Sequence, residues 1–225
     1  MNPSRRRLVT LLGLVGASLF CVALVLVRYA ESGSPKFTGL IWNLFLAWIP
    51  FVLAVAVYDQ WRRGRRASGS LFALGALWLL FFPNAPYIVT DFVHLERTDD
   101  APYWYDAVTV SAFAWTGVLL GFASLFLVQT VVRQWRGVVA GWAFAAVALA
   151  LGSLGIYLGR FLRLNSWDAL EHPSVLPRIL HAVARDPFQY TEAIGVTVLF
   201  TLALGFAYFL MYSFAVVGRE LDVER

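Results

Sequence analysis

Long apolar stretches separated by short polar ones run along almost the whole chain. A helix needs about 20 predominantly apolar residues to cross a hydrocarbon core of about 30 Å. Because no water is available at that depth, each crossing segment has to satisfy its own backbone hydrogen bonds. The pattern therefore predicts an all-α, polytopic helical membrane bundle with six spans, near residues 8–27, 38–58, 70–90, 107–128, 137–159 and 193–217.

The third span is interrupted by prolines. Its apolar part before them, residues 70–82, amounts to about 20 Å of helix at 1.5 Å per residue, which is too short to cross alone. Proline lacks an N–H group and pushes the preceding residue out of the α region. Pro83 and Pro86 therefore predict a stop near Phe82 and a new helix with Asn84 as its N-cap.

The restarted helix is expected to have a polar face. Tyr87, Asp91 and His94 follow one another at spacings of four and three residues, so the carboxylate and the imidazole should be neighbours. Two interpretations of the break stay open. It is either an ordinary proline kink whose helix ends among the headgroups, or a helix start whose freed N–H groups at residues 84–87 bind an anion.

A second polar block follows the fifth span. Its polar side chains are Arg160, Arg163, Asn165 and Asp168. The planar fork of arginine suits bidentate contacts with carboxylates and phosphates. Because ionisable groups near a membrane core usually find partners, we expect Asp91 to pair with Arg160 or Arg163. The other candidate partners of these two arginines are acidic loop residues such as Asp106, lipid phosphates and an anionic ligand. The alternative is that both arginines snorkel to the membrane surface without binding a ligand.

Composition and charge agree with a bilayer as solvent. Hydrophobic residues make up 60% of the 225 positions, and charged residues 14%, against about 25% in ordinary soluble domains. Most of the 18 lysines and arginines fall on the inner side if the N-terminus is cytoplasmic, which predicts that both termini lie there. The excess of basic residues behind the net charge of +4 is therefore explained by membrane topology, and nucleic acid is not an expected partner.

The chain is expected to form one membrane domain, residues 1–225, since no repeat or linker interrupts it. The first span should stay uncleaved, because its core is long for a signal peptide and no small-x-small cleavage site follows it. Residues 173–188 have an apolar and a basic face. This pattern favours a helix lying on the outer leaflet over a lid.

Metal and cofactor motifs are weak in this sequence. The single cysteine, Cys21, excludes an internal disulfide framework and a cysteine-rich zinc site. Three histidines, at positions 94, 172 and 181, could in principle join Asp91 around a divalent ion. No metal-binding or nucleotide-binding motif supports such a site, so we predict no metal and no cofactor.

Three classes of function stay open. The first is binding of an anionic envelope or lipid component on the outer side, in a structural or accessory role, through Asn84, Tyr87, Arg160, Arg163, Asn165 and Asp168. The second is an enzyme that acts on a lipid-linked substrate, with Asp91 and His94 as its acid–base pair and Ser166 or Thr90 as nucleophile candidates. The third is a small-solute transporter with a broken helix. Another membrane protein is a further possible partner.

Two stretches, LFFPNAPYIVTDFVHL and GRFLRLNSWD, resemble the signature segments of a bacterial multi-pass membrane family, domain of unknown function 1361. The matching blocks are Pro83 to Asp91 and Gly159 to Asp168, and the resemblance extends from the second span to the sixth. It implies several helices in a bacterial cytoplasmic membrane. It carries no assigned reaction, but it suggests that the two blocks belong to one site.

Overall fold

All regular elements of the described chain are helices. The structure, a computed structural model, describes residues 3–64, 68–97, 100–171, 174, 178, 185 and 190–223. Within these residues, six helical segments are long and apolar enough to cross a membrane: Arg7–Ser32, Thr38–Arg62, Gly69–His94, Tyr103–Arg136, Val138–Phe161 and Thr191–Val216. The predicted all-α membrane architecture is therefore confirmed. His172, His181 and most of the expected interfacial helix at 173–188 lie outside the described residues.

The helices form two compact units, Met1–Val131 and Val132–Arg225. The first contains α1 (Pro3–Ser32), α2 (Thr38–Arg62), α3 (Gly69–Phe81), α4 (Asn84–Tyr87), the 3-10 helix η1 (Ile88–His94) and most of α5 (Tyr103–Arg136). The second contains the end of α5, α6 (Val138–Phe161), α7 (Asp168–Glu171) and α9 (Thr191–Val223). That the whole chain behaves as one domain, with both termini in the cytoplasm, stays a prediction.

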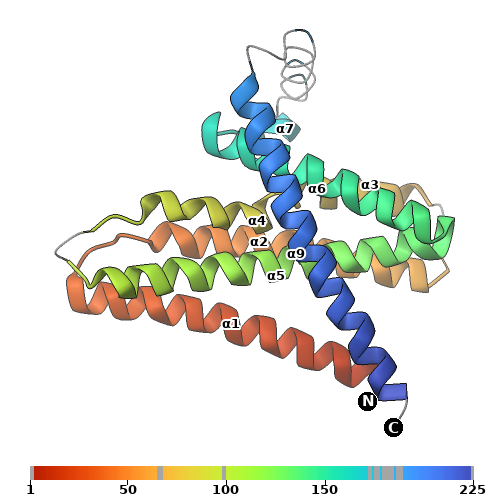
Figure 1. Ribbon diagram of the computed structural model, residues 1–225, viewed down its shortest axis with the longest axis horizontal. Coiled ribbons are helices and arrows are strands. Elements are labelled where there is room, and N and C mark those ends of the chain that lie inside the picture. The colour runs from red at the N-terminus through yellow and green to blue at the C-terminus, as the bar shows by residue number, and fades with distance from the viewer. Residues whose placement is uncertain are drawn as a thin grey trace. The chain divides into compact units, whose positions relative to one another are not determined.

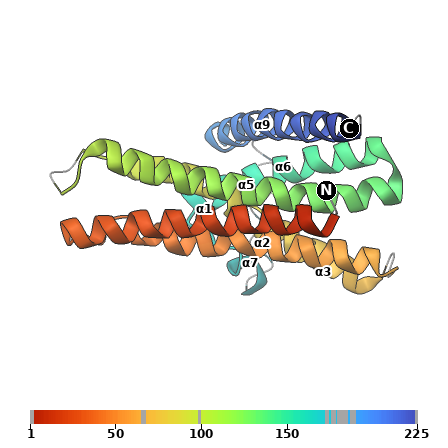
Figure 2. The same cartoon turned by 90° about the horizontal axis from the view of Figure 1, so that it is seen from below.

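In the first unit α1, α2, the α3–η1 segment and α5 run lengthwise beside one another (Figures 1 and 2). Buried side chains from all of them meet in one apolar core, which includes Cys21, Leu44, Ala85, Ile88 and Phe113. Large apolar side chains also point outward: Leu19 is 65% exposed and Trp115 is 66% exposed. Such outward apolar residues are expected where lipid is the surrounding solvent.

The interruption of the third span is confirmed in position, and it is milder than the sequence predicts. Helix α3 ends at Phe81 and α4 begins at Asn84, but Phe82 and Pro83 keep right-handed helical angles, with φ of −53° and −57°. The Tyr87 N–H group donates to the Pro83 carbonyl oxygen at 3.0 Å. The chain therefore continues through the prolines as a kinked helix and then tightens into η1.

Asn84 stabilises the kink in a way that differs from the expected N-cap. Its Nδ2 donates to the Phe81 carbonyl oxygen at 3.0 Å. The Ala85 N–H group, which would normally serve that carbonyl, instead donates to Phe82. Ala85 and Tyr87 already donate to backbone carbonyls and Pro86 has no N–H group, so residues 85–87 offer no free N–H group to an anion. The hypothesis of an anion-binding helix start is therefore wrong at these three residues.

Two glycines of α5 let the kinked segment approach closely. A Cβ atom at Gly117 would lie 2.5 Å from the Ala85 carbonyl oxygen and 2.9 Å from Cδ1 of Ile88. A Cβ atom at Gly121 would lie 3.2 Å from that of Ala85. Small residues four positions apart allow the backbones of membrane helices to pack closely. The α4 segment therefore lies directly against the α5 backbone.

Replacing Gly117 with alanine is expected to lower stability by about 1–3 kcal/mol, because the new methyl group overpacks against backbone atoms that cannot move aside. Thermal unfolding of the detergent-purified protein measures this effect. Gly75→Ala is the matched control, since Gly75 lies inside α3 with nothing within 4 Å of the added atom. Equal melting temperatures for Gly117→Ala and the wild type would contradict the close contact.

Candidate functional site

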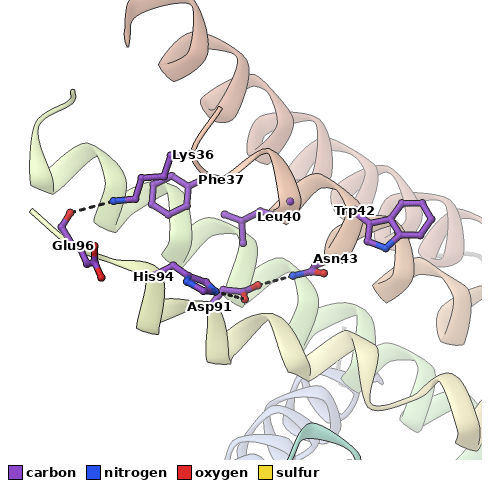
Figure 3. A pocket seen from close by; sticks show the side chains of 9 residues that line it. Lys36, Phe37, Leu40, Trp42, Asn43, Asp91, His94 and Glu96 are labelled. Atoms are coloured by element: carbon purple, nitrogen blue, oxygen red, sulfur yellow. Dashed lines mark hydrogen bonds and ion pairs between the residues drawn. The ribbon is translucent and has the colours of Figure 1, made fainter. Parts of the chain in front are cut away.

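A cavity of about 450 Å³ lies in the first unit, where the start of α2 faces η1 (Figure 3). Its two walls come from segments far apart in the sequence. The lining residues are Lys36, Phe37, Gly39, Leu40, Trp42 and Asn43 on the α2 side, and Asp91, His94 and Glu96 on the η1 side. Asp91 and His94, both predicted as site residues, therefore lie in one cavity.

Asp91 is a nearly buried acid at this cavity, with 3% of its surface exposed. Its Oδ2 accepts a hydrogen bond from Nδ2 of Asn43 at 2.8 Å, and its Oδ1 lies 4.0 Å from Nε2 of His94. The side chain of His94 is 59% exposed. The Asn43 amide offsets part of the cost of burying the carboxylate and fixes its orientation. The imidazole occupies the solvent side of the pair.

Lys36 and Phe37 form the other side of the cavity. Nζ of Lys36 donates to the Glu96 backbone carbonyl oxygen at 3.4 Å, and the same ammonium lies 5.2 Å from the centre of the Phe37 ring. The Arg28 guanidinium also lies 5.2 Å from that ring. Phe37 has a left-handed backbone, with φ of 71°, which is rare for a bulky residue and costs about 1–3 kcal/mol.

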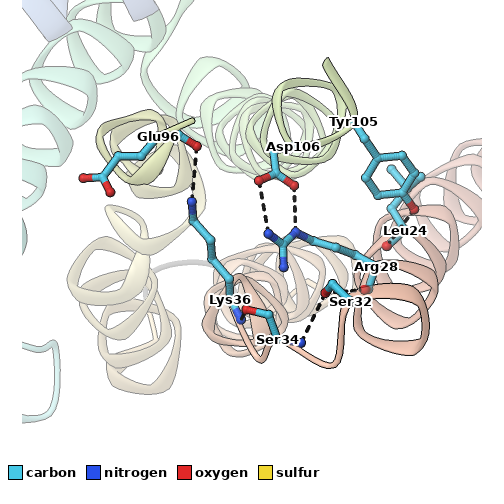
Figure 4. A network of polar contacts seen from close by, with 8 residues as sticks. All are labelled: Leu24, Arg28, Ser32, Ser34, Lys36, Glu96, Tyr105 and Asp106. Carbon is cyan, nitrogen blue, oxygen red and sulfur yellow. Dashed lines mark hydrogen bonds and ion pairs between the residues drawn. The ribbon is translucent and has the colours of Figure 1, made fainter. Parts of the chain in front are cut away.

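A buried ion pair in the first unit joins α1 to α5 (Figure 4). Nε of Arg28 donates to Oδ1 of Asp106 at 2.7 Å, and Nη2 donates to Oδ2 at 3.2 Å. Both side chains are buried, with exposures of 0% and 1%. The Tyr105 hydroxyl adds a hydrogen bond to the Leu24 carbonyl oxygen at 2.9 Å. Asp106, considered above as a partner of the outer arginines, therefore pairs with Arg28.

The second polar block belongs to the second unit and is ordered by local contacts. Oδ2 of Asp168 accepts the Asn165 backbone N–H group at 2.6 Å and the Asn165 Nδ2 at 3.3 Å. Arg163 is exposed and has a φ of 55°, at the turn after α6 where glycine or asparagine is usual. These two predicted site residues, Asn165 and Asp168, are thus brought together. The expected pairing of Asp91 with Arg160 or Arg163 stays a prediction.

Comparison with known proteins identifies a family. The sequence model of a family described as "Protein of unknown function (DUF1361)" matches residues 42–207. The chain belongs to this family. The matched region includes Asp91, His94 and the block from Arg160 to Asp168, whereas Arg28 and Lys36 precede it. No curated protein and no solved structure matches the chain.

Of the nine residues that line the cavity in this DUF1361 protein, sequence reasoning predicted only Asp91 and His94 as site residues. Asn43, Lys36 and Glu96 all line it, while the predicted Asn84 and Tyr87 are not among its lining residues. Asn43 carries the one usable signal: it is a polar side chain inside an otherwise apolar span, and such residues need a partner. The ion pair of Arg28 and Asp106 also had a signal in the sequence. The two residues carry opposite charges and lie at the ends of two spans that are expected on the same side of the membrane.

Removing Arg28 should strongly destabilise this DUF1361 protein, by about 3–5 kcal/mol, because Arg28→Ala leaves Asp106 buried without its counter-charge. Thermal unfolding in detergent measures the change, with Arg63→Ala as control, since Arg63 is an exposed arginine at the end of α2. The double variant Arg28→Met/Asp106→Leu should recover much of the loss. Equal loss in the single and double variants would show that charge pairing is not the cause.

Proposed function

We propose that this DUF1361 protein, an integral membrane protein, binds the phosphate-bearing head group of an envelope lipid or lipid-linked molecule. The binding site is the cavity between α2 and η1, the role is structural or accessory, and the location is the cytoplasmic membrane of a bacterium. The observation that carries this proposal is Asp91, an acid only 3% exposed that nevertheless lines a cavity of about 450 Å³. Buried ionisable groups beside such cavities are typical of binding sites.

Lys36 supplies the contact for an anionic group. Its hydrogen bond to the Glu96 carbonyl oxygen is 3.4 Å long, beyond the usual 2.7–3.2 Å range of N–H···O bonds, so it is weak. A phosphate oxygen that approaches Nζ forms a shorter, charge-assisted bond. Lys36 can therefore exchange a weak internal acceptor for a ligand without losing a strong interaction.

An aromatic pair beside the cavity favours an amphiphile over a small soluble ligand. Trp42 lines the cavity and is 56% exposed, and Phe45 one turn later on α2 is 57% exposed. Their rings stack with centres 5.3 Å apart. Tryptophan is enriched where a membrane meets water. A polar cavity that adjoins an exposed aromatic surface matches a molecule with a polar head and an apolar tail.

Lipid occupancy of the purified protein, measured by native mass spectrometry, tests this function. Lys36→Met should lower occupancy by about tenfold or more, because a charge-assisted hydrogen bond contributes about 1.5–3 kcal/mol. Arg97→Met is the control, since Arg97 is an exposed cation just after the cavity residues and does not line it. Wild-type occupancy in both Lys36→Met and Asp91→Asn would exclude the cavity as the binding site.

An enzyme acting on a lipid-linked substrate is the second candidate, and one observation favours it. A buried carboxylate lies behind an exposed imidazole, with Oδ1 of Asp91 4.0 Å from Nε2 of His94. A shift that shortened this distance to a hydrogen bond would give the arrangement that orients a general base. Thr90 is not a free nucleophile, because its hydroxyl donates to the Tyr87 carbonyl oxygen at 2.8 Å. The lining residues carry no hydroxyl group. His94 would therefore activate water or a hydroxyl group of the substrate. The transporter alternative stays a prediction.

Incubating the protein with a lipid extract and following products by mass spectrometry separates the two candidates. If His94 is a general base, His94→Gln should slow product formation by about 10²- to 10⁴-fold while lipid binding persists. An equal rate in the variant and the wild type, or no product at all, would rule out this chemistry and leave the binding role.

A further inference from the structure

Arg28 has one nitrogen that its ion pair with Asp106 does not use. Nε and Nη2 donate to the two carboxylate oxygens, at 2.7 and 3.2 Å. Nη1 lies on the side of the guanidinium away from Asp106 (Figure 4). It is buried, and among the described residues no atom accepts a hydrogen bond from it. Because buried donors nearly always have a partner, we expect an acceptor from outside the chain at Nη1, either a water molecule or a ligand.

The ring of Phe37 lies between this guanidinium and the cavity. Phe37 lines the cavity, and the centre of its ring lies 5.2 Å from Cζ of Arg28. Arg28 does not line the cavity, and its side chain is 0% exposed. We propose that Arg28 is a second residue that binds the phosphate of the ligand, and that Phe37 covers it until the ligand enters. This inference rests on the proposed binding function and adds a second phosphate donor to the same site.

The first phosphate donor, Lys36, contacts the same ring. Its Nζ lies 5.2 Å from the ring centre, so it is at most twice that distance from Cζ of Arg28. The lysine side chain is flexible, whereas the guanidinium is a rigid fork whose plane is fixed by Asp106. A phosphate group that takes the place of the ring can therefore accept charge-assisted hydrogen bonds from both cations, and the ion pair with Asp106 is kept.

The backbone of Phe37 lowers the cost of uncovering Arg28. Its φ of 71° is a left-handed conformation that bulky residues rarely adopt. The residue lies in the short connection between α1 and α2, immediately before Thr38, the first residue of α2. A change to a common backbone conformation would move the ring and release this strain. The release offsets part of the loss of the two cation–π contacts that hold the ring in place.

The test titrates phosphatidic acid, whose phosphate is terminal, into the full-length protein and measures binding by native mass spectrometry. Phe37→Ala should tighten binding by about fivefold or more, because a larger fraction of the protein then has Arg28 uncovered. Arg28→Lys keeps a cation for Asp106 but has no second nitrogen, so it should weaken binding by about tenfold. Combined with Phe37→Ala, it should also remove the gain. Phe20→Ala, which removes an exposed ring of α1 outside the cavity, is the matched control.

Two further variants keep the test decisive if a substitution prevents folding, which melting temperatures in detergent would reveal. Phe37→Leu keeps an apolar side chain but loses the cation–π contacts, so binding should again tighten. The double variant Arg28→Met/Asp106→Leu removes Nη1 without leaving a buried charge, so it replaces Arg28→Lys. It should bind phosphatidic acid about tenfold more weakly than the wild type.

The outcomes separate this inference from the proposed function. Unchanged binding in both Phe37 variants, with a loss in Lys36→Met, would overturn the cover and leave the binding function in place. A gain that persists when Arg28 is replaced would overturn Arg28 as a phosphate donor and leave water as the acceptor at Nη1. Wild-type binding in Lys36→Met and Asp91→Asn would overturn the binding function as well. Inorganic phosphate should displace the lipid only weakly, and complete displacement would overturn a lipid as the source of the phosphate.

Discussion

The close approach of α4 to α5 is the constraint on which the candidate site depends. Gly117 and Gly121 present bare backbone to the kinked segment, and Ala85 and Ile88 are completely buried against it. Interiors that pack this tightly transmit small displacements instead of absorbing them. The contact therefore fixes where the third span bends, and with it the position of η1. The hydrogen bond between Asp91 and Asn43 of α2 depends on the depth at which the preceding segment is held.

A second connection holds the opposite wall of the cavity. The buried pair of Arg28 and Asp106 joins α1 to α5, and the same guanidinium packs over the ring of Phe37. Phe37 has a strained left-handed backbone, which persists only when the surrounding structure over-determines it. Strain of this kind concentrates at functional positions. The start of α2 is thus positioned by α1 and α5, although it contributes its own side chains to the cavity.

The sequence predicts the spans well, because each crossing segment has to meet the length and hydropathy requirements of the bilayer by itself. Length and hydropathy alone identify the six crossing segments, and Pro83 and Pro86 locate the interruption. The form of the interruption was not predictable in the same way. Asn84 replaces the missing donor to Phe81 with its own side chain, a local solution that the spacing of residues does not distinguish from a helix cap.

The contacts between helices could not be read from the sequence, because they depend on which helices are neighbours. The Asn43–Asp91 hydrogen bond joins residues 48 positions apart, and Arg28 and Asp106 are 78 positions apart. Charge alone allowed Asp106 to pair with several arginines. Asp106 pairs with Arg28 because α1 and α5 are neighbours in the folded unit. The periodic pattern of residues within a single helix does not predict which helices are neighbours.

The distance along the chain between Arg28 and Asp106 has a consequence for biogenesis. During translation α1 reaches the membrane before α5, the fourth spanning helix, has been made. Until then Arg28 remains in the headgroup region, where its charge is hydrated. Its position near the end of α1, four residues before Ser32, allows this. The final burial of the guanidinium can take place only after α5 has inserted. The burial of this ion pair is therefore a late step in the assembly of the first unit, although one of its partners belongs to the first helix made.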